Sequence, residues 1–299
     1  ERLAKFLQNP AAAYGPMIGK ADALSLEHKF FHWPLEFPDV FEQGGFDVML
    51  GNPPWERIKF EEKEFFINRV PEISNAKTKA KRTRLIESLK IDKPLIYEEY
   101  IGGLHRAESL GKFIRFSSRF GLTASGDLNT YSIFTELVTN TINGSGRMAV
   151  IVPLGIATDD STKDFFVSVI QHQRLVSLFG FTNWEFIFKD VGDRFAFCLI
   201  TISGNSYKFN APSFAFHLHN VYQLQDSQRR FSLTKDDFNL INPNTNSCPI
   251  FRTEKDSELT KKIYRNSTII HNDKTGMNDW SLTLLRMFDM SLDSHLFHD

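Results

Sequence analysis

The tetrapeptide Asn52-Pro53-Pro54-Trp55 holds the residues of this sequence whose types and spacing could do chemistry. The exocyclic amine of a nucleobase is a poor nucleophile, because its lone pair is delocalised into the ring. A catalyst that methylates this amine must therefore accept its two N–H hydrogens. Asn52 offers a side-chain carbonyl, and Pro53 offers a backbone carbonyl that its ring holds in place. The tetrapeptide therefore predicts a site where an exocyclic amine is methylated.

The other two residues of the tetrapeptide have supporting roles in this hypothesis. Pro54 stiffens the turn. Trp55 provides a ring on which a base can stack, which contributes about 1–3 kcal/mol per base in single-stranded nucleic-acid binding. No general base need act first, since the methyl donor of such reactions is a sulfonium and the amine can lose its proton after transfer.

A short apolar run, residues 46–50, precedes the tetrapeptide. Its alternating and β-branched side chains predict a buried strand, which Gly51 and the two prolines end abruptly. Ligands of open α/β sheets bind beyond the carboxyl ends of the strands. We therefore expect the tetrapeptide to form a turn at such an edge.

The continuous stretch from Phe46 to Trp55 resembles the Asn-Pro-Pro-Tyr/Phe/Trp motif of adenine-specific DNA methyltransferases. The surrounding sequence, FHWPLEFPDVFEQGGFDVMLGNPPWERIK, is similar to the type IIG restriction-modification and BREX-like methylase group. Further similar segments, including DLNTYSIFTELV and SGRMAVIVP, follow in the order of that group, so the resemblance covers roughly residues 26–299.

This resemblance implies a site-specific enzyme that transfers a methyl group from S-adenosylmethionine to the exocyclic amine of a flipped adenine. The implied partners are double-stranded DNA and subunits of a restriction or phage-defence system. Cytosine stays open as an acceptor, because its exocyclic amine is chemically similar. A non-catalytic DNA-binding or assembly module that keeps the methylase fold is the alternative function.

A glycine-rich strand-turn for S-adenosylmethionine is missing from the sequence. The nearest candidate, Tyr14 to Lys20, predicts an ordinary turn because no β-branched strand precedes it. A circularly permuted order is one explanation, but no later segment restores the loop. We therefore expect a fragment that lacks the cofactor motif and most of the target-recognition domain and is inactive alone, and we assign no cofactor-binding residue.

The pattern of the chain predicts an α/β fold: the C-terminal part of a Rossmann-like methyltransferase sheet with an inserted charged helical region and a mixed α+β extension. We expect a lead-in at 1–45, a catalytic half at 46–205 with a charged helical insertion at about 56–125, and a bridge to the target-recognition domain at 206–299. Gly144 should close a helix over 127–142. The predicted strands are 147–153, 174–181, 195–202 and 213–218, and a further helix spans 163–172.

Five cations without an acid lie in the insertion, and they are the predicted contacts to the DNA backbone: Lys77, Lys79, Lys81, Arg82 and Arg84. If all five met phosphates, binding would depend on salt with a logarithmic slope of about −4.5. The net charge of the chain is −1, so DNA binding must come from a local patch of this kind. A solvated helix or a mobile loop is the alternative interpretation.

The loop between the predicted strands 174–181 and 195–202 carries Phe188. In adenine methyltransferases the equivalent loop presents an aromatic ring to the flipped base, so the resemblance implies a stacking clamp formed by Trp55 and Phe188. Such a clamp could offset the few kcal/mol that base flipping costs. Packing of Phe188 in the core is equally compatible with a sequence that contains 29 phenylalanines.

Other chemistry is disfavoured. His217 and His219 share one face of a predicted strand but lack a third ligand, so we predict no metal site. Pro38-Asp39 and Glu61-Glu62-Lys63 imitate a nuclease motif, yet residues 61–66 form a helical pattern. Two cysteines without a second pair indicate a reducing compartment, and no apolar stretch has membrane-spanning length. We therefore expect a cytoplasmic protein without membrane partners.

Overall fold

The structure is a computed structural model that describes residues 8–9, 15–283, 285–289 and 292–296. The chain divides into two compact units, residues 1–46 and 47–299. The first unit contains α2 (Pro16–His28), α3 (Trp33–Glu36) and α4 (Pro38–Glu42). Gly19 lies inside α2, so the stretch up to Lys20 is mostly helix rather than the predicted turn, and Tyr14 lies outside the described residues.

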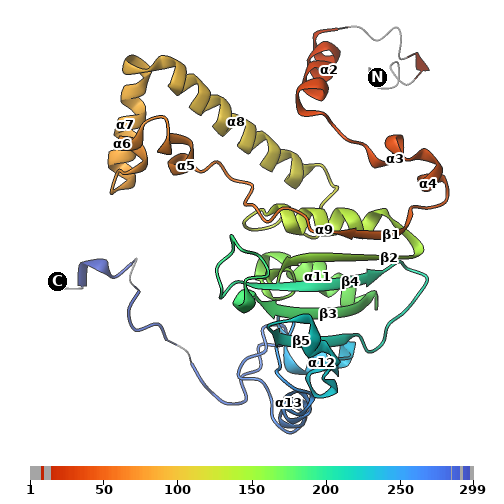
Figure 1. Cartoon of the computed structure of the whole chain (residues 1–299). Helices are drawn as coiled ribbons and strands as arrows, with labels where there is room; N and C mark the ends of the chain where they lie inside the picture. The colour runs from red at the N-terminus through yellow and green to blue at the C-terminus, as the bar shows by residue number, and fades with distance from the viewer. Residues whose placement is uncertain (1–7, 10–14, 284, 290–291, 297–299) are drawn as a thin grey trace. The chain divides into compact units, whose positions relative to one another are not determined.

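A six-stranded mixed sheet organises the second unit, in the order β1-β2-β4-β3-β5-β6 (Figure 1). Strand β4 runs antiparallel to both β2 and β3, whereas β3 and β5 are parallel. The strands are β1 (Phe46–Gly51), β2 (Ile142–Pro153), β3 (Leu175–Thr182), β4 (Ala196–Ser203), β5 (Ser213–Leu218) and β6 (Phe231–Ser232). The sheet confirms the predicted α/β fold class.

Strand β1 lies at the edge of this sheet and runs in the same direction as β2. Near their starts, Asn143 Nδ2 donates to Asp47 Oδ1 at 2.6 Å. Just beyond the end of β1, the indole N–H of Trp55 donates to the carbonyl of Ile151 near the end of β2, at 3.2 Å. The Asn-Pro-Pro-Trp turn therefore follows the carboxyl end of β1, beside the corresponding end of its neighbour.

The prediction that β1 is a buried strand is wrong. Met49 packs against the core, but Val48 is 61% exposed and Leu50 is 76% exposed. Their side chains alternate with Met49 and so lie on the opposite face. An edge position with only one covered face explains the difference, because an apolar run does not reveal how many faces are covered.

The helix before β2 is α9 (Thr130–Thr141), and β2 begins directly at Ile142. The predicted closing role of Gly144 is therefore wrong, since this glycine lies within β2. Helix α11 (Lys163–Gln171) forms where predicted and buries Phe165 and Phe166 in the main core. The remaining short helices of this region are α10 (Gly155–Thr158), η2 (Asp160–Thr162) and η3 (Asn183–Glu185).

The charged insertion is a group of helices with a core of its own. Phe66, Ile73 and Tyr100 are buried together in it. Gly103 permits the close packing of Phe60, because a Cβ there would lie 2.5 Å from a ring carbon. The helices are α5 (Glu62–Ile67), α6 (Pro71–Ser74), α7 (Lys79–Asp92) and α8 (Pro94–Phe116).

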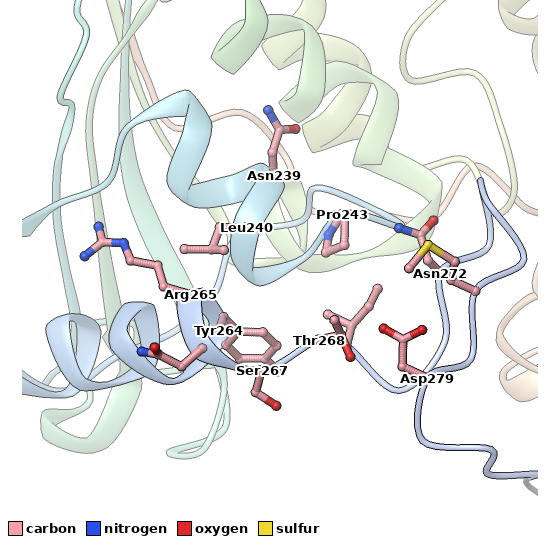
Figure 2. A pocket seen from close by; sticks show the side chains of 12 residues that line it. Asn239, Leu240, Pro243, Tyr264, Arg265, Ser267, Thr268, Asn272 and Asp279 are labelled. Atoms are coloured by element: carbon pink, nitrogen blue, oxygen red, sulfur yellow. The ribbon is translucent and has the colours of Figure 1, made fainter.

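The segment after β5 combines short helices with irregular chain and leaves a cavity of about 440 Å³ (Figure 2). Leu240 and Pro243 lie on one side of this cavity, and Asn272 and Asp279 lie on the chain that follows α13 (Figure 2). The helices are η4 (Val221–Gln225), η5 (Ser227–Arg229), α12 (Lys235–Ile241), α13 (Glu254–Asn266) and η6 (Ser294–Leu296). Within the described part of the chain, no helix combines the length and apolar character that a membrane crossing requires.

Candidate functional site

The two acceptors that the sequence predicts, Asn52 Oδ1 and the Pro53 carbonyl, lie at the carboxyl end of β1. Asn52 is exposed and Pro53 is half-buried. Among the described residues, neither the Asn52 side chain nor the Pro53 carbonyl has a hydrogen-bond partner. Both acceptors are therefore free to receive hydrogens from a ligand.

The turn around these acceptors is held by its neighbours. The Thr130 hydroxyl donates to the Pro54 carbonyl at 2.7 Å and accepts from the Glu56 amide at 2.9 Å. The Thr130 amide in turn donates to the Glu56 carbonyl at 2.9 Å. These contacts tie the turn to the first residue of α9, and the Trp55 bond ties it to β2.

Sequence reasoning did not identify Thr130 as part of the site. Its partners Pro54 and Glu56 are 76 and 74 positions away in the chain, so no local pattern connects them. The available signal was the Asn129-Thr130 pair at the start of a predicted helix, where Asn129 does cap α9 through the Tyr131 amide. The hydroxyl and the amide of Thr130 both bond to the turn, so this residue holds the backbone next to the two acceptors.

We predict that Thr130→Val loosens the turn. Valine keeps the shape but loses the bonds to Pro54 and Glu56, which should cost about 1 kcal/mol of unfolding free energy and lower any methylation by about tenfold. Urea unfolding and a methyl-transfer assay measure the two effects. Thr130→Ser should restore both, and Thr83→Val, which removes an exposed hydroxyl bonded to Lys79, is the matched control. Equal behaviour of the two valine variants would contradict the positioning role.

The structure brings Trp55 and Phe188 together. Their ring centroids lie 5.2 Å apart with the planes at 65°, so the contact is edge-to-face. Phe195 stacks on Trp55 at 5.6 Å with the planes at 12°. The edge-to-face contact leaves no room for a base between Trp55 and Phe188, so a two-sided clamp requires one ring to move.

Asn183 fixes the backbone of the loop that carries Phe188. This asparagine is fully buried, and its amide group donates to the carbonyls of Phe188 and Val191 at 2.8 and 2.7 Å. Its carbonyl accepts from the Phe188 amide at 2.9 Å. Since the backbone is held, rotation of the Phe188 side chain is the simplest movement that opens space beside Trp55.

The predicted DNA-backbone cations lie at the start of α7 and divide into two groups. Lys77, Lys79, Lys81 and Arg84 are exposed. Arg82 instead donates to Glu62 at 2.7 Å, with its side chain 16% exposed.

The Arg82 ion pair belongs to the core of the insertion. Tyr100 donates to the other oxygen of Glu62 at 3.1 Å. Burial and the neighbouring Glu62 carboxylate raise the pKa of Tyr100 to about 12. Arg82 is therefore engaged inside the protein, while the other four cations face solvent.

The position of the exposed cations is electrostatically unfavourable for the helix. The first turn of α7 contains Lys79 and Lys81 and no acid. Backbone N–H groups already give a helix N-terminus partial positive charge, so anions stabilise it and cations do not. A groove of about 770 Å³ beside this helix is lined by six basic side chains, including Lys112 and Arg115, and by three glutamates. Positive charge thus accumulates where an anion would be stabilised.

The described residues contain no group of three or more metal-ligating side chains. His217 and His219 do line one cavity. Glu62 of the nuclease-like motif is occupied by Arg82 and Tyr100.

The matched residues of a known family include this turn. Residues 5–92 match the Eco57I restriction-modification methylase family. The match covers less than half of the chain. It supports the interpretation that the turn is the one found in restriction-modification methylases. No curated protein matches the chain.

Solved structures of restriction-modification proteins are similar only at a low level. The type IIG restriction endonuclease BpuSI is 12% identical over 64% of this chain and 19% of its own, with a TM-score of 0.36. A DrdV–DNA complex is 11% identical over 69% of this chain and 18% of its own, with a TM-score of 0.34. The type I methyltransferase subunit from Streptococcus thermophilus is 15% identical over 53% of this chain and 29% of its own, with a TM-score of 0.25. This chain thus spans less than a third of each, and TM-scores of this size support no conclusion about function.

Proposed function

We propose that this chain contains the base-binding turn of a DNA methyltransferase that acts on the exocyclic amine of adenine. One observation carries the proposal: Asn52 and Pro53 present free carbonyl oxygens on a turn that Trp55 and Thr130 anchor. The Eco57I methylase match includes this turn. A rigid pair of acceptors beside an aromatic ring fits an amine attached to a flat base.

In this proposal the chain acts on the amine by accepting hydrogen bonds. One N–H of the amine donates to Asn52 Oδ1 and the other donates to the Pro53 carbonyl. Both bonds draw the hydrogens out of the ring plane, so the nitrogen lone pair becomes less delocalised and more nucleophilic. The turn is already held by Trp55 and Thr130. The two acceptor oxygens therefore need not be reorganised when the base binds.

S-adenosylmethionine is the methyl donor of the proposed reaction, but the described residues do not fit it as a complete site. They contain no glycine-rich strand-turn, and Gly19, the nearest glycine of the candidate stretch, lies inside α2. No group on the described part of the chain is therefore assigned to the donor, and the contribution of this chain is on the acceptor side.

The base stacks on the rings around Trp55 in this proposal. Trp55 supplies one face, and Phe188 joins after its side chain rotates away from the edge-to-face contact. A stacked base is stabilised by about 1–3 kcal/mol. The exposed cations at the start of α7 hold the DNA backbone, which base contacts alone could not position.

The proposal is tested by the identity of the methylated base. The complete natural protein is incubated with duplex DNA and isotopically labelled S-adenosylmethionine, and the digested nucleosides are analysed by mass spectrometry. We expect labelled N6-methyladenine. Labelled N4-methylcytosine would keep the reaction type but correct the substrate, and labelled 5-methylcytosine would overturn the role of the two acceptors, since carbon is not an amine.

A DNA-binding or assembly module without turnover is the second candidate. The exposed Val48 and Leu50 on the edge strand β1 favour it, because such a strand can pair with another chain, such as a subunit of a restriction or defence system. Specific DNA binding by the complete protein without any labelled nucleoside would support this candidate.

A further inference from the structure

A second polar cavity lies at the end of β5, and it has no part in the proposed methylation chemistry. Its volume is about 390 Å³, and we call it the histidine–arginine pocket after His217, His219, Arg229 and Arg252 in its lining. Asp226 is the one acid among the lining residues. The volume lies in the range of ligand sites, about 300–1,000 Å³.

A β-bulge points His217 toward this pocket. Phe179 of β3 pairs with Ala215 of β5, whereas Phe181 pairs with Leu218, so β5 holds one extra residue between the pairs. His217 takes a left-handed conformation there, with φ 55°. Such strain in a residue other than glycine clusters at functional sites, and bulges re-aim side chains.

The residue before His217 packs tightly in the main core. Phe216, the residue before His217, is buried against Gly180 of the neighbouring strand β3. A Cβ on Gly180 would lie 2.6 Å from a ring carbon of Phe216, so a larger residue at this position would have to displace that buried ring. Phe216 thus points into the core, and the next residue, His217, lines the cavity.

The charge of the pocket is positive. Arg229 pairs loosely with Asp226, with 3.7 Å between Nε and Oδ2. Arg252 is exposed and has no ion-pair partner in the part of the chain that the structure describes. Partial burial lowers the pKa of His217, and the positive charges of Arg252 and Arg229 lower it further. A guanidinium without a carboxylate partner is the group that suits a phosphate best.

The pocket also contacts the loop that carries Phe188. Trp184 of this loop stacks on His219 with centroids 6.0 Å apart. Glu185 accepts from the side-chain amide of Asn220 at 2.9 Å. The same loop contacts Trp55 at its other end through Phe188. An anion in the pocket would therefore lie one loop away from the base-binding turn.

We propose that the histidine–arginine pocket binds a phosphate group, and that this phosphate belongs to the DNA backbone near the flipped base. The chemistry of the pocket supports the phosphate, and its contact with the Phe188 loop supports DNA as the source. Only the assignment to DNA rests on the proposed function. The arginines bind the phosphate oxygens, and the imidazole groups donate N–H bonds to them.

Histidine NMR tests the phosphate in the isolated chain. The protein is labelled selectively in its histidines and titrated with inorganic phosphate and, separately, with a short duplex DNA. Both ligands should move the imidazole signals of His217 and His219, and phosphate should raise the pKa of His217, because an anion stabilises its charged form. Unmoved signals with both ligands would overturn the proposal, whereas movement with phosphate alone would overturn the assignment to DNA.

Two arginines, one inside and one outside the lining of the pocket, provide the matched binding experiment. Arg252→Gln removes the unpaired cation of the pocket, and Arg230→Gln removes an exposed cation next to Arg229 that does not line the pocket. Fluorescence anisotropy with labelled duplex DNA should show about 3–10-fold weaker binding for Arg252→Gln and a salt slope smaller by about 0.9. Arg230→Gln should stay within about twofold of the unmodified chain.

Equal affinities of the two arginine variants would overturn the pocket as a DNA contact. His217→Asn is the second variant, because asparagine tolerates the left-handed backbone and removes the imidazole. It should also weaken binding while leaving the urea midpoint unchanged. None of these measurements requires methyl transfer. They therefore test phosphate binding in the pocket independently of the role of Asn52 in methylation.

Discussion

We expect that replacing Asn52 with alanine abolishes methylation while DNA binding survives. The asparagine carbonyl accepts one of the two amine hydrogens in our proposal, and no other side chain of the turn can replace it. Removal of a single preorganised group of this kind typically costs about 10²–10³ in kcat. The loss should fall on kcat and leave the affinity for DNA nearly unchanged, because Asn52 contacts the amine alone.

The Asn52→Ala experiment needs a control for folding and one for the loss of an amide. Asn52 is exposed and bonds to no described residue, so its replacement should leave the urea midpoint unchanged. Asn205→Ala removes another exposed asparagine outside the site and should keep full activity. Steady-state methylation and anisotropy in the complete natural protein measure the two properties. Methylation by Asn52→Ala at more than about a tenth of the normal rate would refute the acceptor role.

A second large effect is expected from the four exposed cations at the start of α7. Changing Lys77, Lys79, Lys81 and Arg84 together to glutamine should reduce the salt slope of DNA binding by about 3.6, or 0.9 for each phosphate contact. The unmodified chain should therefore lose about 100-fold more affinity than the variant between 50 and 200 mM salt. This value is below the slope for all five cations because Arg82 is engaged with Glu62.

The same variant should fold more stably. Lys79 and Lys81 oppose the dipole of α7, and removal of each should stabilise the helix by about 0.3–1 kcal/mol. Arg82→Gln should do the opposite: it keeps the salt slope but lowers the urea midpoint, because Glu62 loses its partner. Four exposed lysines elsewhere, at positions 235, 255, 262 and 274, provide a control of equal charge. An equal change of slope in that control would show that total charge, and not α7, binds DNA.

Local patterns were sufficient for several elements of the fold. The strand 213–218 forms with the predicted bounds, and the helix predicted at 163–172 ends one residue earlier. These segments carry their period and their end signals within a few residues. The Asn-Pro-Pro-Trp turn was also recognisable locally, because two prolines after a strand leave few conformations.

Long-range contacts explain what the sequence did not show. The apolar run before Asn52 has the same pattern whether one or two faces are covered, so the exposure of Leu50 depends on the position of β1 at the sheet edge. Arg82 pairs with Glu62, which lies 20 positions earlier in the chain. Thr130 bonds to the turn, which lies more than 70 positions earlier. Only the fold decides these pairings. The roles of Asn52, Pro53 and Phe188 stay predictions.

The attachment of the turn to α9 links the lifetime of the site to local unfolding. Pro54 and Glu56 are held by the first residue of a helix whose next turns are buried. The two carbonyls keep their spacing as long as this helix end stays closed. Fraying at Thr130 would release them together, so amide exchange at Glu56 and Thr130 would report how often the site is lost. The spacing of the two acceptor carbonyls thus depends on the core against which α9 packs. Substitutions in that core can change this spacing although they do not contact the turn.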